Sequence, residues 1–197
     1  MIVPATRADI PALSEVLARA FDDDPWTNWF IRQDGQRGPA FRLFYRVCLE
    51  RFGLPAGESY TTADRIGAAL WNPPGTWQIG VWQQILFLPQ LVKVVGWRRL
   101  YQGLRGINMI AERHPILPHR YLFMLGVDPA HQGKGHGSAF LRPGLERCDR
   151  ERMPSYLETG TEKNVQLYER FGYRIRSELQ IPDGGPKVWL MWREPAV

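Results

Sequence analysis

The spacing of apolar residues along the chain predicts alternating strands and helices. Short apolar runs between turn residues indicate strands, and apolar residues three and four positions apart indicate amphipathic helices. Strands are expected at 2–6, 58–64, 66–71, 121–127, 154–158, 173–180 and 187–193. Helices are expected from Asp9 to Ala20, over 39–52, as a pair between 78 and 112, and over about 135–152 and 164–171. The order of these elements predicts a mixed α/β fold.

The run YLFMLGV, residues 121–127, predicts a buried strand. It is apolar throughout and lacks the alternation of a half-exposed strand, which is typical of a strand covered on both faces. Val127-Asp128-Pro129 ends this run, and a helix follows. Pro143 and Gly144 lie inside that helix, where a proline removes one backbone hydrogen bond, so we expect a kink there.

Composition limits the classes of protein that the chain can belong to. A length of 197 residues fits one domain, 1–197, with a helical insert at about 78–114. The share of hydrophobic residues, 44%, with 23% charged residues, indicates a globular protein rather than a disordered one. The net charge of +5 favours an anionic ligand, but no block of Lys and Arg indicates nucleic-acid binding.

Targeting and membrane signals are weak in this sequence. The N-terminal residues lack the basic and apolar regions of a signal peptide. The most apolar stretch, 79–95, is interrupted by glutamines, a proline and a lysine, so no membrane span is predicted. We therefore expect a cytoplasmic protein without membrane contact.

The segment HQGKGHG, residues 131–137, is a loop with three glycines and two histidines. It does not match the P-loop GxxxxGK[ST], because Lys134 precedes Gly135 and Ser138 lies four residues further on. It is one residue short of the dinucleotide fingerprint GxGxxG. His131 and His136 have no further metal ligands nearby, and the chain has no CxxC, so no metal site is expected.

The loop fits a pyrophosphate better than a metal ion. Its glycines let the backbone approach a ligand closely, and it lies between a buried strand and the start of a helix. Consecutive amides at a helix N-terminus, together with the helix dipole, favour a bound anion. The alternative is a strand-to-helix turn in which the glycines serve the geometry alone.

The residues around this loop resemble a known family. Gln132-x-x-Gly135-x-Gly137, after a strand ending in Val-x-Pro, is similar to the acetyl-coenzyme A signature of the GNAT family of N-acetyltransferases. LGVDPAHQGKGHGSAFLRPGL and YLETGTEKNVQLYERFGY resemble motifs A and B of that family, closest to the puromycin N-acetyltransferase-like branch. The resemblance is specific over about 120–175 and looser before it. It implies a mixed, mostly antiparallel central sheet, splayed at the cofactor site and flanked by helices.

The resemblance implies acetyl-coenzyme A (acetyl-CoA) as cosubstrate and no metal. Amides of the strand before the loop would pair with the pantetheine arm, that of Val127 would face the thioester carbonyl, and Gly126 is the expected place of a bulge. Asn164 would hold the pantetheine by its amide, or serve as a helix N-cap. The implied cofactor-binding residues are Leu125, Gly126, Val127, Gln132, Gly133, Lys134, Gly135, His136, Gly137, Ser138 and Asn164.

Two residues are candidates for catalysis. Tyr168 matches a family tyrosine that lies near the thioester, and a phenol can donate a proton to the leaving sulfur; the alternative is a tyrosine that serves packing. Glu158 ends a predicted strand, where its carboxylate could accept the proton of the amine directly or through a water. Substrate anchoring and a structural hydrogen-bond acceptor are the alternatives for Glu158.

The acceptor side is less defined by the sequence. The segment FDDDPWTNWF, 21–30, combines carboxylates and aromatic rings, which suits a cationic amine, or forms a helix cap with a core cluster. Other candidates for the pocket wall are Glu112, His114, Trp77 and Trp82.

The resemblance implies that a small-molecule primary amine attacks acetyl-CoA directly in a ternary complex, on a monomer or homodimer. A non-catalytic acyl-CoA-binding or partner-interaction module of the same fold is the alternative from another class. A nucleotide-binding enzyme that uses the loop for ATP is a third, against which the missing P-loop lysine counts.

Overall fold

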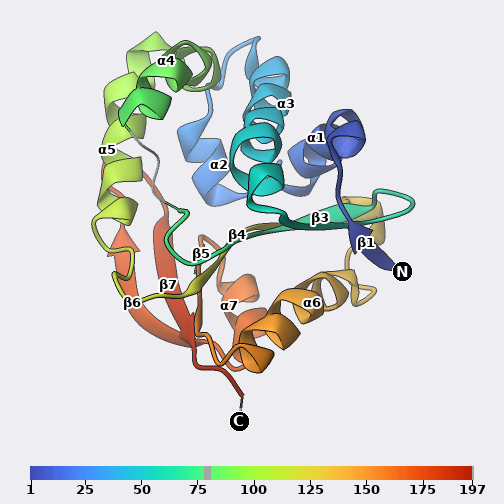
Figure 1. The fold of residues 1–197 in the computed structure, drawn as a ribbon. Helices are drawn as coiled ribbons and strands as arrows, with labels where there is room; N and C mark the ends of the chain where they lie inside the picture. Colours follow the sequence, from blue (N-terminus) through green and yellow to red (C-terminus); the bar gives the residue numbers. More distant parts are fainter. Residues whose placement is uncertain (78–80, 197) are drawn as a thin grey trace.

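A seven-stranded sheet runs through the protein in the order β1-β2-β3-β4-β5-β7-β6 (Figure 1). The computed structural model describes residues 1–77 and 81–196. The strands are β1 (Ile2–Pro4), β2 (Glu58–Thr62), β3 (Gly67–Asn72), β4 (Arg120–Val127), β5 (Ser155–Thr159), β6 (Arg174–Gln180) and β7 (Lys187–Arg193). Neighbouring strands are antiparallel except β4 and β5, which are parallel. The predicted strands and the mostly antiparallel sheet are confirmed, with shifts of one or two residues at strand ends.

Helices cover both faces of this sheet. The helices of the described residues are α1 (Ile10–Ala20), α2 (Pro25–Phe30), α3 (Arg37–Cys48), α4 (Val81–Val95), α5 (Leu100–Ala111), α6 (His136–Arg150) and α7 (Glu162–Glu169). In Figure 1, α1 to α4 lie above the sheet, α6 and α7 lie below it, and α5 lies beside α4 near β6. The predicted pair of helices between 78 and 112 is confirmed as α4 and α5, while 78–80 lie outside the described residues.

The short helix α2 was not predicted, because Asp22 to Pro25 come just after the helix predicted to end at Ala20 and are residues that commonly end a helix. In the structure the same residues also begin one. The Asp24 side chain accepts hydrogen bonds from the backbone N–H and the hydroxyl of Thr27, at 2.8 and 2.9 Å. Pro25 takes the first helical position, where its missing N–H costs no hydrogen bond.

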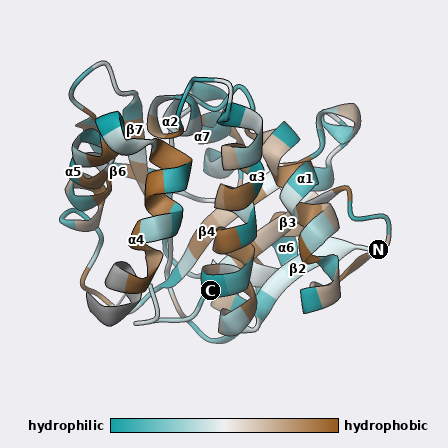
Figure 2. Ribbon diagram, turned by 90° about the horizontal axis from the view of Figure 1, so that it is seen from above, coloured by the Kyte–Doolittle hydropathy of each residue, from teal (hydrophilic) through white to brown (hydrophobic). Residues whose placement is uncertain are grey.

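Buried side chains form one hydrophobic core on each face of the sheet. On β3 the two cores are separated by strand alternation: Ala68 and Leu70 belong to the core under α1 to α4, and Ala69 and Trp71 to the core against α6 and α7. Figure 2 shows hydrophobic and hydrophilic stretches alternating along α3, as expected of a helix with one buried side. All six residues of β3 are buried, which places this strand and β4 at the centre of the fold.

The parallel strands β4 and β5 pair at two positions and then separate. Arg120 pairs with Ser155 and Tyr121 with Tyr156, and no further pair joins them among the described residues. Beyond this point β5 stays paired with β7 as far as Thr159. β4 stays paired with β3 as far as Val127. The two strands therefore form a fork that opens toward the glycine loop, and the predicted splayed sheet is confirmed.

A buried arginine fixes the closed end of the fork. Arg120, the first residue of β4, is 4% exposed. Its guanidinium donates to Glu58 on β2 and, at 2.6 Å, to Glu151 after α6. Its backbone N–H donates to the carbonyl of Pro154 just before β5, at 2.9 Å. Because a buried charge is tolerated only when it is paired, these contacts lock the start of β4 to three neighbouring segments.

The fork is also held by a close contact between α6 and β3. α6 runs as one helix through Pro143, and Gly144 lies directly against the indole of Trp71. A Cβ on Gly144 would lie 2.2 Å from Trp71 Cε2. Since Trp71 is fully buried, the ring has little room to move away.

Replacing Gly144 by alanine should therefore lower the free energy of unfolding. Alanine normally stabilises a helix by about 0.5–1 kcal/mol relative to glycine, but overpacking a core costs about 1–3 kcal/mol. Urea denaturation of Gly144→Ala checks the sign. Gly35→Ala is the control, because a Cβ there meets no atom within 4 Å. A Gly144→Ala protein as stable as wild type would contradict the tight contact.

Candidate active site

Two residues of β4 turn their backbone groups into the fork. Asp128 N–H donates to Ile66 just before β3, whereas Arg120 N–H donates toward β5. Arg120 and Asp128 are an even number of residues apart, so in a regular strand their N–H groups would point to the same side. Here they point to opposite sides of β4. The register shift opposite Leu70 and Trp71 explains this, because it leaves Phe123 as an extra residue without a partner. From there on, Leu125 and Val127 present their backbone toward the gap beside β5.

The bulge in β4 does not lie at Gly126, so that prediction was wrong. Gly126 pairs regularly with Ala68 on β3. It is a glycine for another reason: a Cβ there would lie 2.7 Å from Leu17 Cδ2 and from Phe21 Cε2. The small residue lets α1 cross closely over β4, which keeps β4 on β3 while β5 diverges.

The glycine loop at the open end of the fork has a geometry that can accept an anion. Gly133 and Gly135 have φ of +75° and +82°, the left-handed region that glycine adopts without strain. α6 begins at His136, and its first backbone bond runs from Ala139 N–H to Gly135 O at 3.0 Å. The amides of the first helical turn, at 136–138, therefore have no partner within the helix. Such amides at a helix N-terminus bind phosphate groups.

The polar side chains of the loop bind the loop itself. Gln132 Nε2 donates to the carbonyl of Val127 at 3.0 Å, so the carbonyl at the strand end is already satisfied. Lys134 Nζ donates to the carbonyl of Ala130 at 3.0 Å. Asp128 accepts from Ala130 N–H at 3.0 Å and pairs with Arg19 on α1 at 2.5 Å. What the loop offers to an anion is thus mainly backbone N–H.

The two loop histidines do not complete a metal site in the described structure. The rings of His131 and His136 lie edge to face, with centroids 6.1 Å apart. Within residues 1–77 and 81–196, no group of three or more His, Cys, Asp or Glu side chains could hold a metal ion.

Helix α7 places Tyr168 beside the fork. The N-cap residue of α7 is Thr161. Asn164 lies in the first turn of this helix, and its backbone N–H donates to Thr161 O at 3.1 Å. The N-cap alternative for Asn164 was therefore wrong, and its side chain is half-buried.

Tyr168 is 6% exposed and belongs to the same core cluster as Val127 and Leu157. Burial raises the pKa of its phenol, and the charge of Asp24 raises this pKa further, so the hydroxyl stays protonated. Among the described residues no hydrogen bond occupies this hydroxyl.

Glu158 lies on β5, with its side chain 11% exposed and its Oε1 atom without a hydrogen-bond partner. The imidazole of His114 lies next to it, with Nδ1 3.4 Å from Oε1. Tyr121 and Tyr156 border the carboxylate. Burial raises the pKa of both phenols, and the negative charge of Glu158 raises it further. A carboxylate with an unsatisfied oxygen in an aromatic setting is available for a proton or a cation.

The acidic and aromatic segment 21–30 forms a helix cap and part of the core, and two of its residues also lie near the end of β5. Asp24 caps α2, while Trp29 and Phe30 are buried in the core, so the cap-and-core alternative is confirmed for these residues. Asp24 and Trp26 also border the end of β5: a Cβ on Gly160 would lie 3.9 Å from Asp24 Oδ2 and 3.8 Å from Trp26 Cβ. Burial raises the pKa of Asp24.

A cluster behind Glu158 was largely missed from the sequence. His114 stacks on Trp77, with ring centroids 3.7 Å apart, and its Nε2 lies 2.9 Å from His119 Nε2. The sequence suggested His114 and Trp77 as candidates for the pocket wall, but it did not suggest His119. The segment HPILPH holds both histidines and two prolines, and this spacing is the one local signal. Glu112 is exposed.

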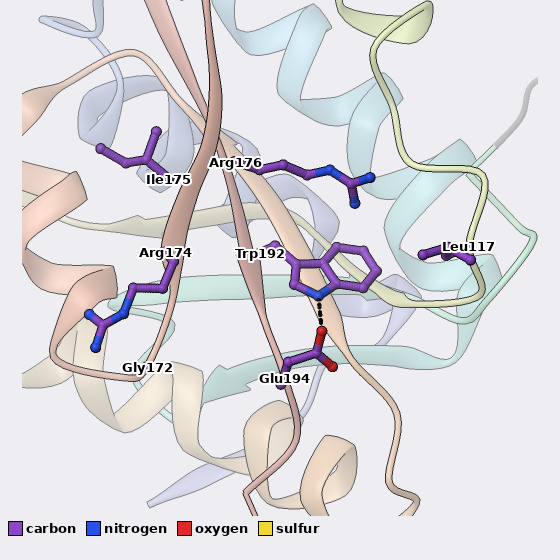
Figure 3. Close-up of a pocket in the computed structure, with 7 residues that line it drawn as sticks. All are labelled: Leu117, Gly172, Arg174, Ile175, Arg176, Trp192 and Glu194. Carbon is purple, nitrogen blue, oxygen red and sulfur yellow. Dashed lines mark hydrogen bonds between the residues drawn. The ribbon is translucent and has the colours of Figure 1, made fainter.

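A hollow of about 560 Å³ lies on the outer side of this cluster (Figure 3). Arg176 on β6 lies 5.3 Å from the ring of Trp192 on β7, and Trp192 Nε1 donates to Glu194 at 2.8 Å. Leu117 forms the opposite wall in Figure 3. None of the predicted site residues lines this hollow, so it is separate from the fork.

The chain resembles known proteins over the residues that form the fork, the glycine loop and α7. A model of the acetyltransferase (GNAT) family matches residues 62–173, which include β3 to β5, the glycine loop and α7. An uncharacterised N-acetyltransferase of Schizosaccharomyces pombe is 36% identical, over 95% of this chain and 80% of the relative. No helix of the described residues is long and apolar enough to cross a bilayer.

Solved structures share the whole fold. A crystal structure described as histone acetyltransferase HPA2 and related acetyltransferase, from Corynebacterium glutamicum, superposes with a TM-score of 0.77 and 28% identity, covering 100% of this chain and 97% of that one. Arylalkylamine N-acetyltransferase 2 from Aedes aegypti superposes with a TM-score of 0.65 at 15% identity, covering 100% and 99%. The second likeness concerns the fold alone.

Proposed function

Because the chain belongs to the acetyltransferase (GNAT) family, we propose that it transfers an acetyl group from acetyl-CoA to the primary amine of a small molecule, by direct attack in a ternary complex. The observation that carries this proposal is the fork between β4 and β5, which ends at a glycine loop and the N-terminus of α6, where a pyrophosphate would fit. The fork is open where the cosubstrate would lie. The candidate base, Glu158, lies on β5, and the candidate acid, Tyr168, lies on α7.

The residues of the fork fit acetyl-CoA. The pyrophosphate would take the amides at 136–138, and a Cβ on Gly133 or Gly135 meets no atom within 4 Å, so the loop surface is open. The pantetheine arm would lie along β4, pairing with the backbone of Leu125 and the N–H of Val127 as a further strand would. Asn164 is the candidate for a side-chain contact to the same arm.

In the proposed chemistry the thioester supplies the acetyl group and this chain moves the protons. A primary ammonium has a pKa near 10.4, so it must lose a proton before attack, and Glu158 accepts that proton and returns it to solvent. Val127 N–H donates to the thioester carbonyl oxygen as negative charge develops there. The C–N bond forms and the C–S bond breaks. Tyr168 donates its proton to the departing sulfur and regains one from the acetylated nitrogen.

The acceptor is proposed from the charges and rings around the fork. Asp24 and Glu158 are acidic, and Trp26, Tyr121 and Tyr156 are aromatic, a combination that suits an organic cation. An amine on an aromatic or nucleoside framework fits this surface. Membership of the puromycin N-acetyltransferase-like branch is part of this proposal and rests on the motifs at 120–175.

Release of free CoA thiol from acetyl-CoA tests the function. Arylalkylamines, polyamines, aminonucleosides and a lysine peptide serve as the acceptor panel. The proposal expects release with at least one free small-molecule amine and a product acetylated on nitrogen. Release with the peptide alone would refute the substrate class. Binding of acetyl-CoA without release from any amine would favour the non-catalytic module.

Acetyl-CoA should raise the melting temperature, because it binds the folded chain at the fork. At a hundred times Kd, such a ligand adds about 2.7 kcal/mol to the unfolding free energy. Gly137→Val should raise the Kd for CoA about tenfold or more and so remove about half or more of this shift, because a branched side chain crowds the amides of the first helical turn. The fold should tolerate it, since the nearest atom to a Cβ at Gly137 is Leu167 Cδ2 at 4.0 Å. Equal CoA affinity in wild type and Gly137→Val, measured by calorimetry, would refute the loop assignment.

Tyr168→Phe should lower kcat about 10²-fold or more and leave the Kd for acetyl-CoA unchanged, because it removes a proton donor and breaks no hydrogen bond in the part of the chain that the structure describes. Tyr173→Phe is the matched control. Its buried hydroxyl accepts from Ser155 Oγ at 2.9 Å, so its loss should lower the melting temperature and leave kcat unaltered. Steady-state kinetics and thermal melts of both variants separate the two roles. Equal kcat in Tyr168→Phe and wild type would remove Tyr168 from the acid role.

A further inference from the structure

Helix α5 packs on the core through two glycines and turns large apolar residues to the solvent. A Cβ on Gly103 would lie 3.2 Å from Phe30 Cε2, and a Cβ on Gly106 would lie 2.7 Å from Trp29 Cη2. The side chains that point away from the core are Trp97, Tyr101, Leu104 and Ile107, which are 78%, 80%, 38% and 37% exposed. A surface helix normally exposes its polar side, so α5 carries an additional apolar side that faces solvent.

These four residues form one continuous surface, called here the outer α5 face. Trp97 lies in a short helical turn, Trp97–Arg99, that leads directly into α5. Tyr101, Leu104 and Ile107 follow at spacings of four, three and three positions, so the side chains share one side of the helix. Figure 1 shows α5 at one edge of the molecule. Contiguous exposed apolar surface of this kind marks an interaction site.

The backbone that carries Trp97 is fixed by the core. The guanidinium of Arg99 donates to the carbonyls of Trp29, at 2.6 Å, and Ile31, at 3.2 Å. Arg99 N–H donates to Gly96 O at 3.2 Å, and Gly96 has a φ of +83°, which a glycine adopts without strain. The Trp97 side chain is therefore held outward by an ordered turn.

The surroundings of the outer α5 face are positively charged. The chain has 20 Asp and Glu residues, but none lies within 65–111, the part of the sequence that includes α4 and α5. Arg98 and Arg105 lie beside the face, two helical turns apart, and Arg98 is exposed. Arg105 reaches Asp183 at 3.5 Å, with both side chains about half exposed, and Glu112 is an exposed carboxylate beyond the end of α5. An anionic occupant complements this charge.

An anionic lipid surface matches the residues of the face. Trp and Tyr rings prefer the headgroup level of a bilayer, aliphatic side chains enter the apolar layer below it, and arginines bind lipid phosphates. A nucleic acid would satisfy the arginines and the rings but offers no apolar layer to Leu104 and Ile107. A second copy would bring Arg98 and Arg105 against the same residues of its partner, because a two-fold contact joins equal patches.

We propose that the outer α5 face docks the protein on an anionic lipid surface, with Trp97 and Tyr101 among the headgroups and Arg98 at the phosphates. The sequence-based expectation of no membrane contact rested on the lack of a membrane span, and a helix that lies on a bilayer needs none. This docking does not depend on acetyl transfer, so it stands or falls separately from the proposed function.

Co-sedimentation with vesicles tests the apolar part of the contact. Vesicles of phosphatidylcholine with about one third phosphatidylserine should bind the wild type about tenfold more tightly than vesicles of phosphatidylcholine alone. Trp97→Ala combined with Tyr101→Ala should lower the partition coefficient on the anionic vesicles about tenfold or more, because it removes the two rings that enter the headgroup layer. Ile175→Ala is the matched control, since Ile175 is an apolar residue of β6 that is 41% exposed, and it should bind like wild type.

The charged part of the contact has its own matched pair of variants. Arg98→Gln should weaken binding to the anionic vesicles about threefold, whereas Arg170→Gln should leave it nearly unchanged. Arg170 is exposed just after α7, on the other side of the sheet from α4 (Figure 1), so both variants lose the same charge at different places. Equal losses in the two variants would show attraction by net charge alone and overturn the proposal.

Lipids with brominated acyl chains report which ring enters the bilayer, because bromine quenches nearby indoles. The wild type should be quenched on anionic vesicles of such lipids. Trp97→Phe keeps an apolar ring, so it should still bind within about threefold but lose most of the quenching. Quenching as strong in Trp97→Phe as in wild type would place another tryptophan in the lipid and contradict the assignment.

Other occupants give different results. Wild type that fails to bind the anionic vesicles, or the double variant binding as tightly as wild type, overturns the proposal. A wild-type dimer that the double variant dissociates, seen by sedimentation velocity without lipid, assigns the face to a second copy and overturns it too. Binding of an RNA duplex that the double variant loses, without vesicle binding, assigns the face to nucleic acid with the same consequence.

Discussion

The structure depends on one break in hydrogen bonding, the point where β4 and β5 stop pairing. Parallel neighbours in a sheet normally pair along their shared length, but these two share Arg120–Ser155 and Tyr121–Tyr156 and then part. Each strand is held by its other neighbour, β4 by β3 and β5 by β7. The backbone that faces the gap is left with donors and acceptors that a ligand can satisfy.

Several contacts keep this fork open and rigid. Arg120 clamps its closed end through Glu58 and Glu151, and Gly126 lets α1 press β4 onto β3. Gly144 lets α6 pack on Trp71 from the other face, and α6 carries at its start the amides proposed to bind the pyrophosphate. The proposed acid and base, Tyr168 and Glu158, come from α7 and β5, on the other arm of the fork. A cosubstrate in the gap would thus contact both arms.

The sequence predicts those features that depend on local pattern. The apolar run at 121–127 and the glycine loop are contiguous, so strand, loop and helix could be placed within two residues. α2 was missed because Asp24-Pro25 both follows one helix and begins another. The bulge was placed at Gly126 because glycine often marks bulges, yet that glycine accommodates α1 and the extra residue is Phe123. The cluster behind Glu158 joins residues about forty positions apart in the sequence, and no local pattern shows that two histidines meet a strand end there.

Hydrogen exchange at the amides of β4 tests the central claim most directly. In the free protein, Leu125 and Val127 should exchange much faster than Gly126 and Asp128, whose amides face β3. Saturating CoA should slow exchange at Leu125 and Val127 and leave Gly126 and Asp128 nearly unchanged. If Leu125 and Val127 were already protected in the free protein, or stayed unprotected with CoA bound, the fork would not be the binding site that this account requires.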